Sequence, residues 1–146
     1  MTFQFRLSTV LKVREYERNL HRQSVSMARE THSQCLADCH CIASERTALL
    51  AELRELNDGD SLPIDKIANR RRHAEQLSHQ LELAEIAADD AARNLERCLK
   101  SLILANRSVQ VLEHLAERQL AEFAKSEARA EAREFDDFVN GSRRAG

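Results

Sequence analysis

The stretch NDGDSLP, residues 57–63, carries the one strong helix-breaking signal between residues 8 and 138. Gly59 suits the left-handed residue that often closes a helix, and Pro63 suits the first turn of a new one. Asp65 then favours the positive end of that second helix. Elsewhere the chain is poor in turn-forming residues, with three Gly and one Pro in 146 residues. The stretch therefore predicts two long helices joined by a short loop.

The expected elements are a helix over residues 6–56, a loop at 57–62, a helix over 63–139 and a basic tail at 140–146. The second stop falls in VNGSRRAG, where Gly141 follows Asn140. Helices joined by so short a loop fold back as antiparallel neighbours, and the numbers of facing residues should then add to about 120. The predicted fold class is all-α: residues 1–146 form a single coiled-coil domain, a long two-helix antiparallel hairpin with a C-terminal helical overhang.

The second helix carries an apolar seam with alternating steps of three and four residues and no charged member, which is typical of a coiled coil. Its members are Ala74, Leu77, Leu81, Ala84, Ala88, Ala91, Leu95, Cys98, Leu102, Ala105, Val109, Leu112 and Ala116. The first helix shows such steps in two phases, separated by a stutter near residues 27–39. These run through Val10, Val13, Glu17, Leu20, Ser24, Met27 and Thr31, and then through Cys35, Cys39, Ile42, Arg46, Leu49, Leu53 and Leu56.

The second helix is the longer one, so residues 118–138 are expected to have no partner within the chain. This overhang still shows Leu120, Phe123 and Phe135 among many charges. Apolar residues on an otherwise polar, unpaired helix indicate a surface that another protein completes.

The stretch QCLADCHCIA, residues 34–43, holds three of the four cysteines. A structural zinc site needs four converging ligands, usually on loops, whereas a helix places Cys35 and Cys39 on one face and turns Cys41 away. Cys98 is expected to lie opposite residue 22, too far along the helices to complete a set. The favoured interpretation is that Cys35, Cys39 and Cys98 are small buried seam residues. Metal binding or thiol sensing remains an alternative.

Composition and motifs exclude several function classes. The formal net charge of −2 gives no general reason to bind nucleic acid. No apolar run is long enough to span a bilayer, and the N-terminus lacks the apolar core of a signal peptide, so we expect a cytosolic protein with reduced thiols. Without a phosphate-binding glycine loop or a catalytic triad, we expect no enzyme activity, no cofactor and no metal. The basic cluster at 70–72 is a solvated surface or a docking site.

Two strings at opposite ends of the chain resemble one known family. FQFRLSTVLKVREYERN, residues 3–19, resembles the start of the FliJ family of flagellar type III export proteins. The matching residues are Phe3, Phe5, Arg6, Leu7, Val10, Leu11, Arg14 and Glu15. LEHLAERQLAEFAKSEARAEAREFDDF, residues 112–138, is similar to the family's C-terminal helix, with Glu117 and Arg118 as its E-R pair and an acidic cluster at 134–137.

The resemblance implies a cytosolic antiparallel hairpin similar to the central stalk of rotary ATPases, located peripherally at the inner membrane at the flagellar base. Its paired terminal segments would enter the pore of the hexameric export ATPase and promote its assembly and activity. The hairpin would also contact the membrane protein of the export gate and escort export chaperones. Nucleic acid and a direct membrane span are not among the expected partners or features.

The resemblance also suggests the binding residues. For the ATPase ring these are Phe3, Phe5, Leu7, Leu11, Arg14, Arg118, Leu120, Phe123, Glu131, Glu134 and Phe135. At the hairpin tip, where many relatives place aromatic residues and this chain has none, they are Leu53, Leu56, Arg70, Arg71 and Arg72. A general coiled-coil scaffold that pairs chains through its seam is the alternative function.

Overall fold

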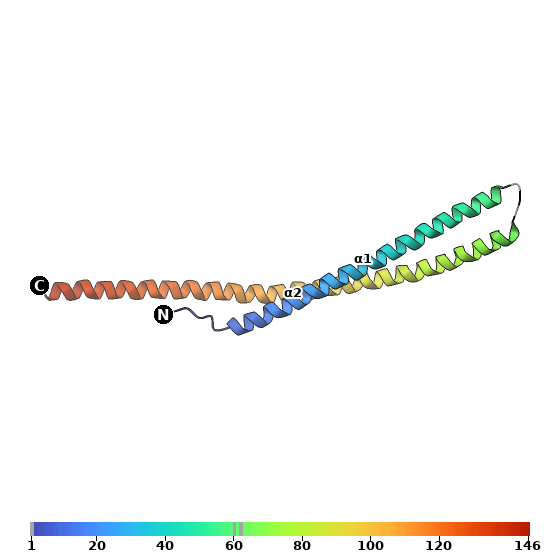
Figure 1. Ribbon diagram of the computed structural model, residues 1–146. Coiled ribbons are helices and arrows are strands. Elements are labelled where there is room, and N and C mark those ends of the chain that lie inside the picture. The colour runs from blue at the N-terminus through green and yellow to red at the C-terminus, as the bar shows by residue number, and fades with distance from the viewer. Residues whose placement is uncertain (1, 60, 62) are drawn as a thin grey trace. The chain divides into compact units, whose positions relative to one another are not determined.

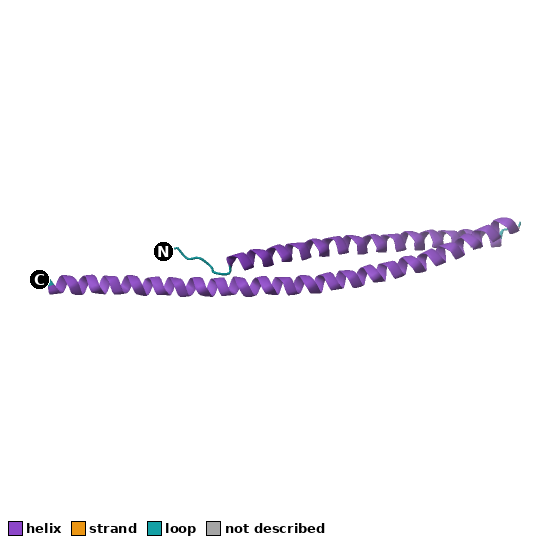
Figure 2. Ribbon diagram, turned by 90° about the horizontal axis from the view of Figure 1, so that it is seen from below, coloured by secondary structure: helices purple, strands orange, loops and turns teal. Residues whose placement is uncertain are grey.

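The computed structural model describes residues 2–59, 61 and 63–146, and across these residues the fold is all-α. Helix α1 runs over Ser8–Asp58 and helix α2 over Ile64–Arg144, and no strand occurs among the described residues (Figures 1 and 2). Each helix therefore extends slightly beyond its predicted C-terminal end. Residues 60 and 62 of the predicted loop lie outside the described part. The predicted fold class, a hairpin of two long helices, is confirmed.

The chain divides into two compact units, and unit 2 comprises His21–Ser101. In it the second part of α1 and the first part of α2 lie antiparallel, joined at the tip of the hairpin (Figure 1). The core of this unit gathers Leu49, Leu53, Ala74 and Leu77, with Ile42 and Ile67 packed against them. Burial of these apolar side chains contributes about 1.5–3 kcal/mol for each large one, which makes the seam the main source of stability here.

Two contacts between basic and acidic side chains of the two helices report the register of unit 2. Arg70 lies 3.1 Å from Glu52, and His73 lies 3.9 Å from Glu45. The residue numbers of the two pairs add to 122 and 118, which agrees with the antiparallel register expected from the sequence. All four side chains are well exposed, so each pair stabilises by less than about 1 kcal/mol and reports register more than strength.

Unit 1 comprises the described residues up to Leu20 together with Leu102–Gly146. The first turns of α1 lie beside α2, and Val109 of α2, only 1% exposed, is the most deeply buried large side chain among the described residues. Residues 2–5, ahead of α1, are extended. The amide of Ser8 donates to the carbonyl of Phe5 at 3.1 Å, which satisfies one of the free donors at the helix start.

The α2 seam expected from the sequence is confirmed along its whole length. Every residue from Ala74 to Ala116 in that pattern is buried or half-buried, and Ala74, Leu77, Ala88, Ala91 and Val109 are the most buried. An uninterrupted apolar stripe leaves a helix only one favourable rotation about its axis, so the phase of α2 could be predicted.

The predicted phase of the first half of α1 is wrong. Met27 is 68% exposed, and Val10, Val13, Leu20, Ser24 and Thr31 are exposed as well. The residues that face α2 continue the downstream seam instead, with no stutter near residue 31. They are Leu11, Glu15, Arg18, His21, Val25, Ala28 and His32, of which Val25 and Ala28 are buried and the others half-buried. Val25 is only 4% exposed. The stripe of α1 that faces α2 is therefore less apolar than the stripe that faces solvent.

Two predictions about glycines are also wrong. No described glycine has a positive φ, and a Cβ on Gly59 would meet only carbonyl oxygens of Glu55, Leu56 and Ser61 at 3.7–3.8 Å, an ordinary contact distance. Helix α2 continues through Gly141 to Arg144, so the predicted basic tail is largely its last turn. A glycine inside a helix costs only about 1 kcal/mol, and arginines at the C-terminal end of a helix interact favourably with its dipole.

Candidate partner-binding surfaces

The N-terminal segment of unit 1 folds onto its own chain. Phe3, Phe5 and Leu7 are half-buried while the residues between them are exposed, the alternation of an extended chain with one face covered. The ring of Phe3 lies 5.5 Å from that of Phe123 of α2, at an interplanar angle of 45°. We call this contact the terminal clamp. It joins the two ends that the sequence predicted to act together.

The terminal clamp corrects the predicted start of the overhang. The sequence placed the uncovered part of α2 from Arg118 onward, whereas Phe123 is half-buried in contact with Phe3. From Ala124 onward every residue of α2 except Val139 is exposed. We therefore define the overhang as residues 124–144 of α2, in place of the predicted 118–138.

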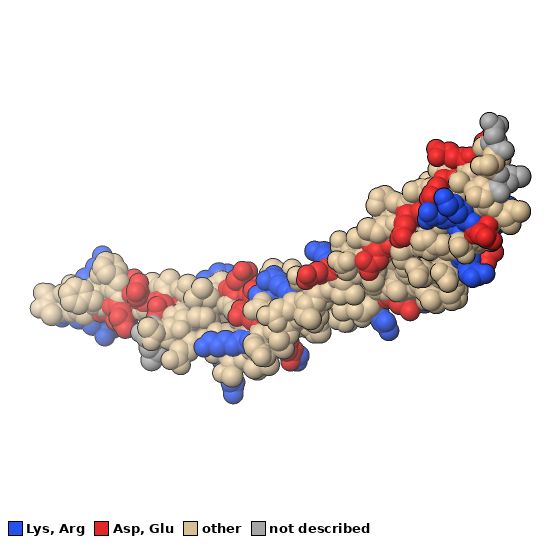
Figure 3. Space-filling model, turned by 45° about the vertical axis from the view of Figure 1, so that its right-hand side comes forward, with Lys and Arg blue, Asp and Glu red and all other residues tan. Residues whose placement is uncertain are grey.

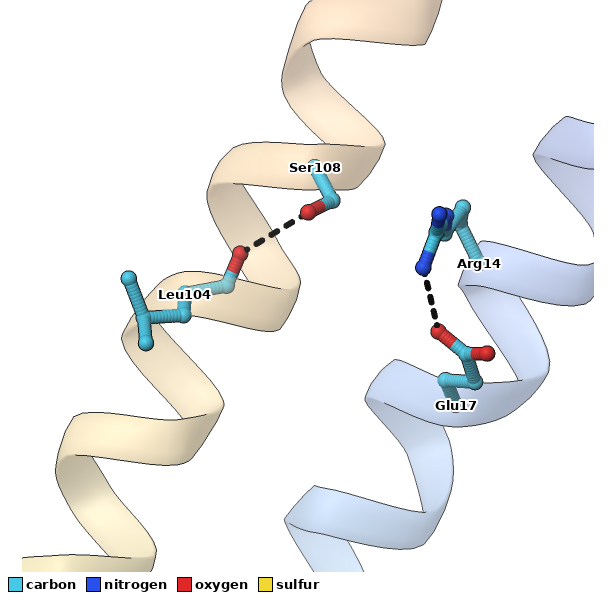
Figure 4. A network of polar contacts seen from close by, with 4 residues as sticks. All are labelled: Arg14, Glu17, Leu104 and Ser108. Carbon is cyan, nitrogen blue, oxygen red and sulfur yellow. Dashed lines mark hydrogen bonds and ion pairs between the residues drawn. The ribbon is translucent and has the colours of Figure 1, made fainter.

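The predicted ring-binding residues separate into two groups. Five are half-buried inside unit 1, and six are exposed. The first group is Phe3, Phe5, Leu7, Leu11 and Phe123; the second is Arg14, Arg118, Leu120, Glu131, Glu134 and Phe135. Arg14 is also engaged by Glu17, whose Oε2 lies 3.0 Å from its Nη1 (Figure 4). The exposed group alone is directly available to a partner.

The overhang carries an exposed apolar stripe that sequence reading found only in part. At about 100° per residue, Ala124, Ala128, Ala132, Phe135 and Phe138 fall within a third of the helix circumference. Phe135 and Phe138 are 67% and 74% exposed. Phe135 was predicted from the sequence as a binding residue and Phe138 was not, although the spacing of three residues between them places both on one face.

A row of basic residues runs along the overhang beside this stripe. Lys125, Arg129 and Arg133 follow each other at intervals of four residues and line one side of a shallow surface depression. The carboxylates are not confined to one face: at about 100° per residue Glu134 lies across the apolar stripe from this basic row, Glu131 falls within the stripe, and Asp136 falls among the basic residues. The overhang is therefore unequal around its axis, with a basic row on one side of an apolar stripe.

The hairpin tip offers less than the sequence suggested. Leu53 is buried in the core of unit 2 and Leu56 is half-buried, so neither forms an exposed anchor. Arg70 is paired with Glu52, whereas Arg71 and Arg72 are exposed. Figure 3 shows acidic and basic side chains mixed over this end of unit 2. The tip therefore has no field of one sign to attract a partner.

The cysteines take the places expected for seam residues. Cys35, Cys39 and Cys98 are half-buried, and Cys41 is exposed. Across the part of the chain that the structure describes, no three His, Cys, Asp or Glu side chains come together in a way that could hold a metal ion. Partial burial raises the pKa of the Cys39 thiol, and the nearby charge of Glu85 adds in the same direction.

The difference in exposure between Cys39 and Cys41 predicts that their thiols react at different rates. The thiolate is the nucleophile, so the raised pKa and partial burial of Cys39 should slow its alkylation. We expect iodoacetamide at neutral pH to modify Cys41 about tenfold faster than Cys39, and the rate at Cys39 to rise only at higher pH. Peptide mass spectrometry over time measures both rates. In urea the two rates should converge; equal rates in the folded chain would contradict the assignment.

Among the described residues, neither helix contains a segment apolar and long enough to cross a membrane.

Comparison with known proteins adds a family and a fold. A family model described as "Flagellar FliJ protein" matches residues 3–143. No curated protein matches the chain. Among solved structures, that of a protein described as a YscO homologue, CT670 from Chlamydia trachomatis, is similar with a TM-score of 0.60 and 19% sequence identity. The match covers 95% of this chain and 94% of the other. At this identity the likeness concerns the fold alone.

Proposed function

Because the chain belongs to the FliJ family and is thus a component of flagellar type III export, we propose that it acts as a non-catalytic central stalk of the export ATPase. In this role it binds inside the hexameric ring, promotes its assembly and stimulates ATP hydrolysis. It also links the ring to the export gate and to export chaperones. We place it in the cytoplasm, peripherally at the inner membrane.

The observation that carries the proposal is the overhang. Residues 124–144 extend α2 beyond the terminal clamp, with two aromatic side chains more than two-thirds exposed. A contiguous apolar stripe on an otherwise polar, unpaired helix is the kind of surface that another protein covers. Aromatic residues are also the commonest anchors of protein interfaces. We therefore assign ring binding to Arg118, Leu120, Glu131, Glu134 and Phe135, and add Phe138.

The half-buried members of the predicted set have a different role in this proposal. Phe3, Phe5 and Leu7 hold the N-terminal segment in unit 1, and Phe3 covers Phe123. They keep α2 supported up to the point where the overhang begins. Their contribution to ring binding is therefore indirect.

A stalk of this kind would act on the ring by differential binding. The overhang presents unlike faces around its axis, so the subunits of a six-fold ring that surrounds it meet different chemistry. Contacts that are stronger with one conformation of a subunit shift that subunit toward it. An asymmetric helix can thereby hold neighbouring subunits in different states, which favours sequential hydrolysis.

The alternative function, a scaffold that pairs chains through the seam, is less well supported. The α2 seam is buried or half-buried against the chain's own α1 in each unit. Chain-to-chain pairing through that seam would require α1 to leave it. Gate docking through the tip remains part of the proposal only for Arg71 and Arg72, because Leu53 is buried.

The overhang aromatics provide the test. We expect replacement of Phe135 and Phe138 by Ser to remove most of the stimulation of the cognate export ATPase, about tenfold or more at subsaturating stalk concentration. Both side chains are exposed, so the thermal stability of the chain should hardly change. Steady-state phosphate release measures the stimulation, and circular dichroism measures the stability.

A matched control uses two other exposed apolar residues of α2. Leu83 and Ile86 are also three residues apart and more than half exposed, but they lie in unit 2. Their replacement by Ser should leave the stimulation intact. If both double variants stimulate like the unaltered chain, the overhang does not bind the ring and the proposal fails.

A further inference from the structure

Unit 1 exposes a second apolar surface that the proposed function does not use. Val10 and Val13 of α1 point away from the seam, as do Leu104 and Val111 of α2. We call these four residues the lateral face. On each helix they follow the three- and four-residue spacing of a helix stripe, since Glu17 continues the α1 series and Ser108 lies between the two α2 residues.

On both helices, residues of the lateral face directly precede residues of the inner stripe, as Val10 precedes Leu11 and Val111 precedes Leu112, so in an antiparallel pair the two stripes fall on the same side of unit 1. Figure 4 shows Leu104 and Ser108 of α2 near the Arg14–Glu17 pair of α1. The hydroxyl of Ser108 donates to the carbonyl of Leu104 at 3.2 Å. Its proton is therefore already used within α2. Each stripe spans eight residues, Val10 to Glu17 on α1 and Leu104 to Val111 on α2, or roughly 12 Å along its helix.

The stripe on α1 stays outside although it is more apolar than the inner one. In unit 1 the residues of α1 that face α2 are Leu11, Glu15 and Arg18, which leaves Val10 and Val13 outside. The inner stripe consequently includes Arg18, whose Nε is buried without a hydrogen-bond partner. Leaving valines in water while burying part of an arginine is unfavourable for the isolated chain. A partner that covers Val10 and Val13 would recover the lost burial.

The charges around the lateral face favour an acidic partner. Arg107 and Arg118 flank it on α2 and have no ion pair with any described residue. Arg14 is the basic member on α1, where it neutralises Glu17 at 3.0 Å. The next carboxylate on this side, Glu122, lies beyond Arg118 next to Lys125. The local excess is therefore positive on a chain whose formal net charge is −2.

We propose that the lateral face binds an amphipathic helix of another protein, about three turns long, whose apolar stripe is flanked by carboxylates. Two antiparallel helices with parallel apolar stripes present the surface that a third helix of a bundle packs against, with contacts at every third or fourth residue. The carboxylates of the incoming helix pair with Arg107 and Arg118. The apolar residues of the lateral face lie outside the overhang, but Arg118 also belongs to the residues assigned to ring binding. Val111→Glu, at a residue with no part in the proposed ring binding, therefore distinguishes this inference from the proposed function.

The test uses two stapled helical peptides of three to four turns with the same leucine stripe, one flanked by Glu and the other by Lys. Fluorescence anisotropy with the full chain should show the Glu peptide binding about tenfold more tightly than the Lys peptide. Val111→Glu should weaken binding of the Glu peptide about tenfold or more. Arg118→Glu should weaken it several-fold and improve binding of the Lys peptide. Ile86→Glu, in unit 2, is the control and should change nothing.

Several results would overturn the inference. Equal affinity for both peptides would refute the acidic chemistry, and Val111→Glu without effect would refute the surface. Dissociation of a dimer by Val111→Glu in sedimentation would mean that a second copy covers the face. Binding to vesicles with anionic phosphatidylglycerol, lost in that variant, would mean that a membrane does. Melting curves equal to that of the unaltered chain ensure that each variant is folded.

Discussion

Val109→Asp is expected to lower the free energy of unfolding by more than about 3 kcal/mol, enough to unfold unit 1 at ordinary temperatures. Val109 is 1% exposed at the centre of that unit. The substitution removes about 1.5–3 kcal/mol of apolar burial and places a carboxylate where no water can reach it.

Val111→Asp is the matched control for this prediction. Val111 belongs to the same helix turn and loses the same side chain, but it is 66% exposed. The shared cost of aspartate in a helix, about 0.5 kcal/mol, is then nearly the whole effect. Urea unfolding followed by circular dichroism at 222 nm measures both variants. Similar losses at the two positions would show that the seam of unit 1 is assigned wrongly.

Val25→Asp is expected to have a comparably large effect in unit 2, a loss of about 3 kcal/mol or more. Val25 is 4% exposed, and the buried Ala28 lies one turn further along the same stripe. This variant tests the corrected phase of α1. The spacing of apolar residues in the sequence had put Met27, not Val25, in the seam.

Met27→Asp is the corresponding control, because Met27 is 68% exposed. The expected change in unfolding free energy is within about 0.5 kcal/mol. Thermal melting of the two variants under identical conditions decides between the phases. If Met27→Asp proves the more damaging, the first half of α1 has the rotation that hydrophobicity alone suggests, and the lateral face is buried.

The two helices differ in how much of their packing could be predicted from sequence. In α2 the stripe from Ala74 to Ala116 contains no charged residue, so local pattern and packing agree. In α1 two stripes compete before residue 32: one holds Val10, Val13 and Met27, and the other holds Arg18 and Val25. Local hydrophobicity favours the first. The second stripe is the inner one, and within unit 2 its Val25 continues the seam of Leu49 and Leu53, which a local comparison of hydrophobicity does not take into account.

The binding surfaces, too, could be predicted only in part from the sequence. Periodicity predicted an uncovered end of α2, but the covering of Phe123 by Phe3 depends on a long-range contact between an extended segment and a helix. The spacing of apolar residues in residues 2–5 does not indicate such a contact. Phe138 could have been found, because it lies three residues after Phe135 on a helix already predicted. The α1 half of the lateral face could not, since Val10 and Val13 had been assigned to the seam.

Backbone amide hydrogen exchange along α2, with and without the cognate export ATPase, tests the central claim most directly. In the free chain we expect slow exchange for residues 102–123, which α1 and the N-terminal segment support, and fast exchange for residues 124–144. Addition of the ATPase hexamer should slow exchange at 124–144 and leave the hairpin tip unchanged. Fast exchange that persists at 124–144 in the bound state, with slowing elsewhere, would contradict the account.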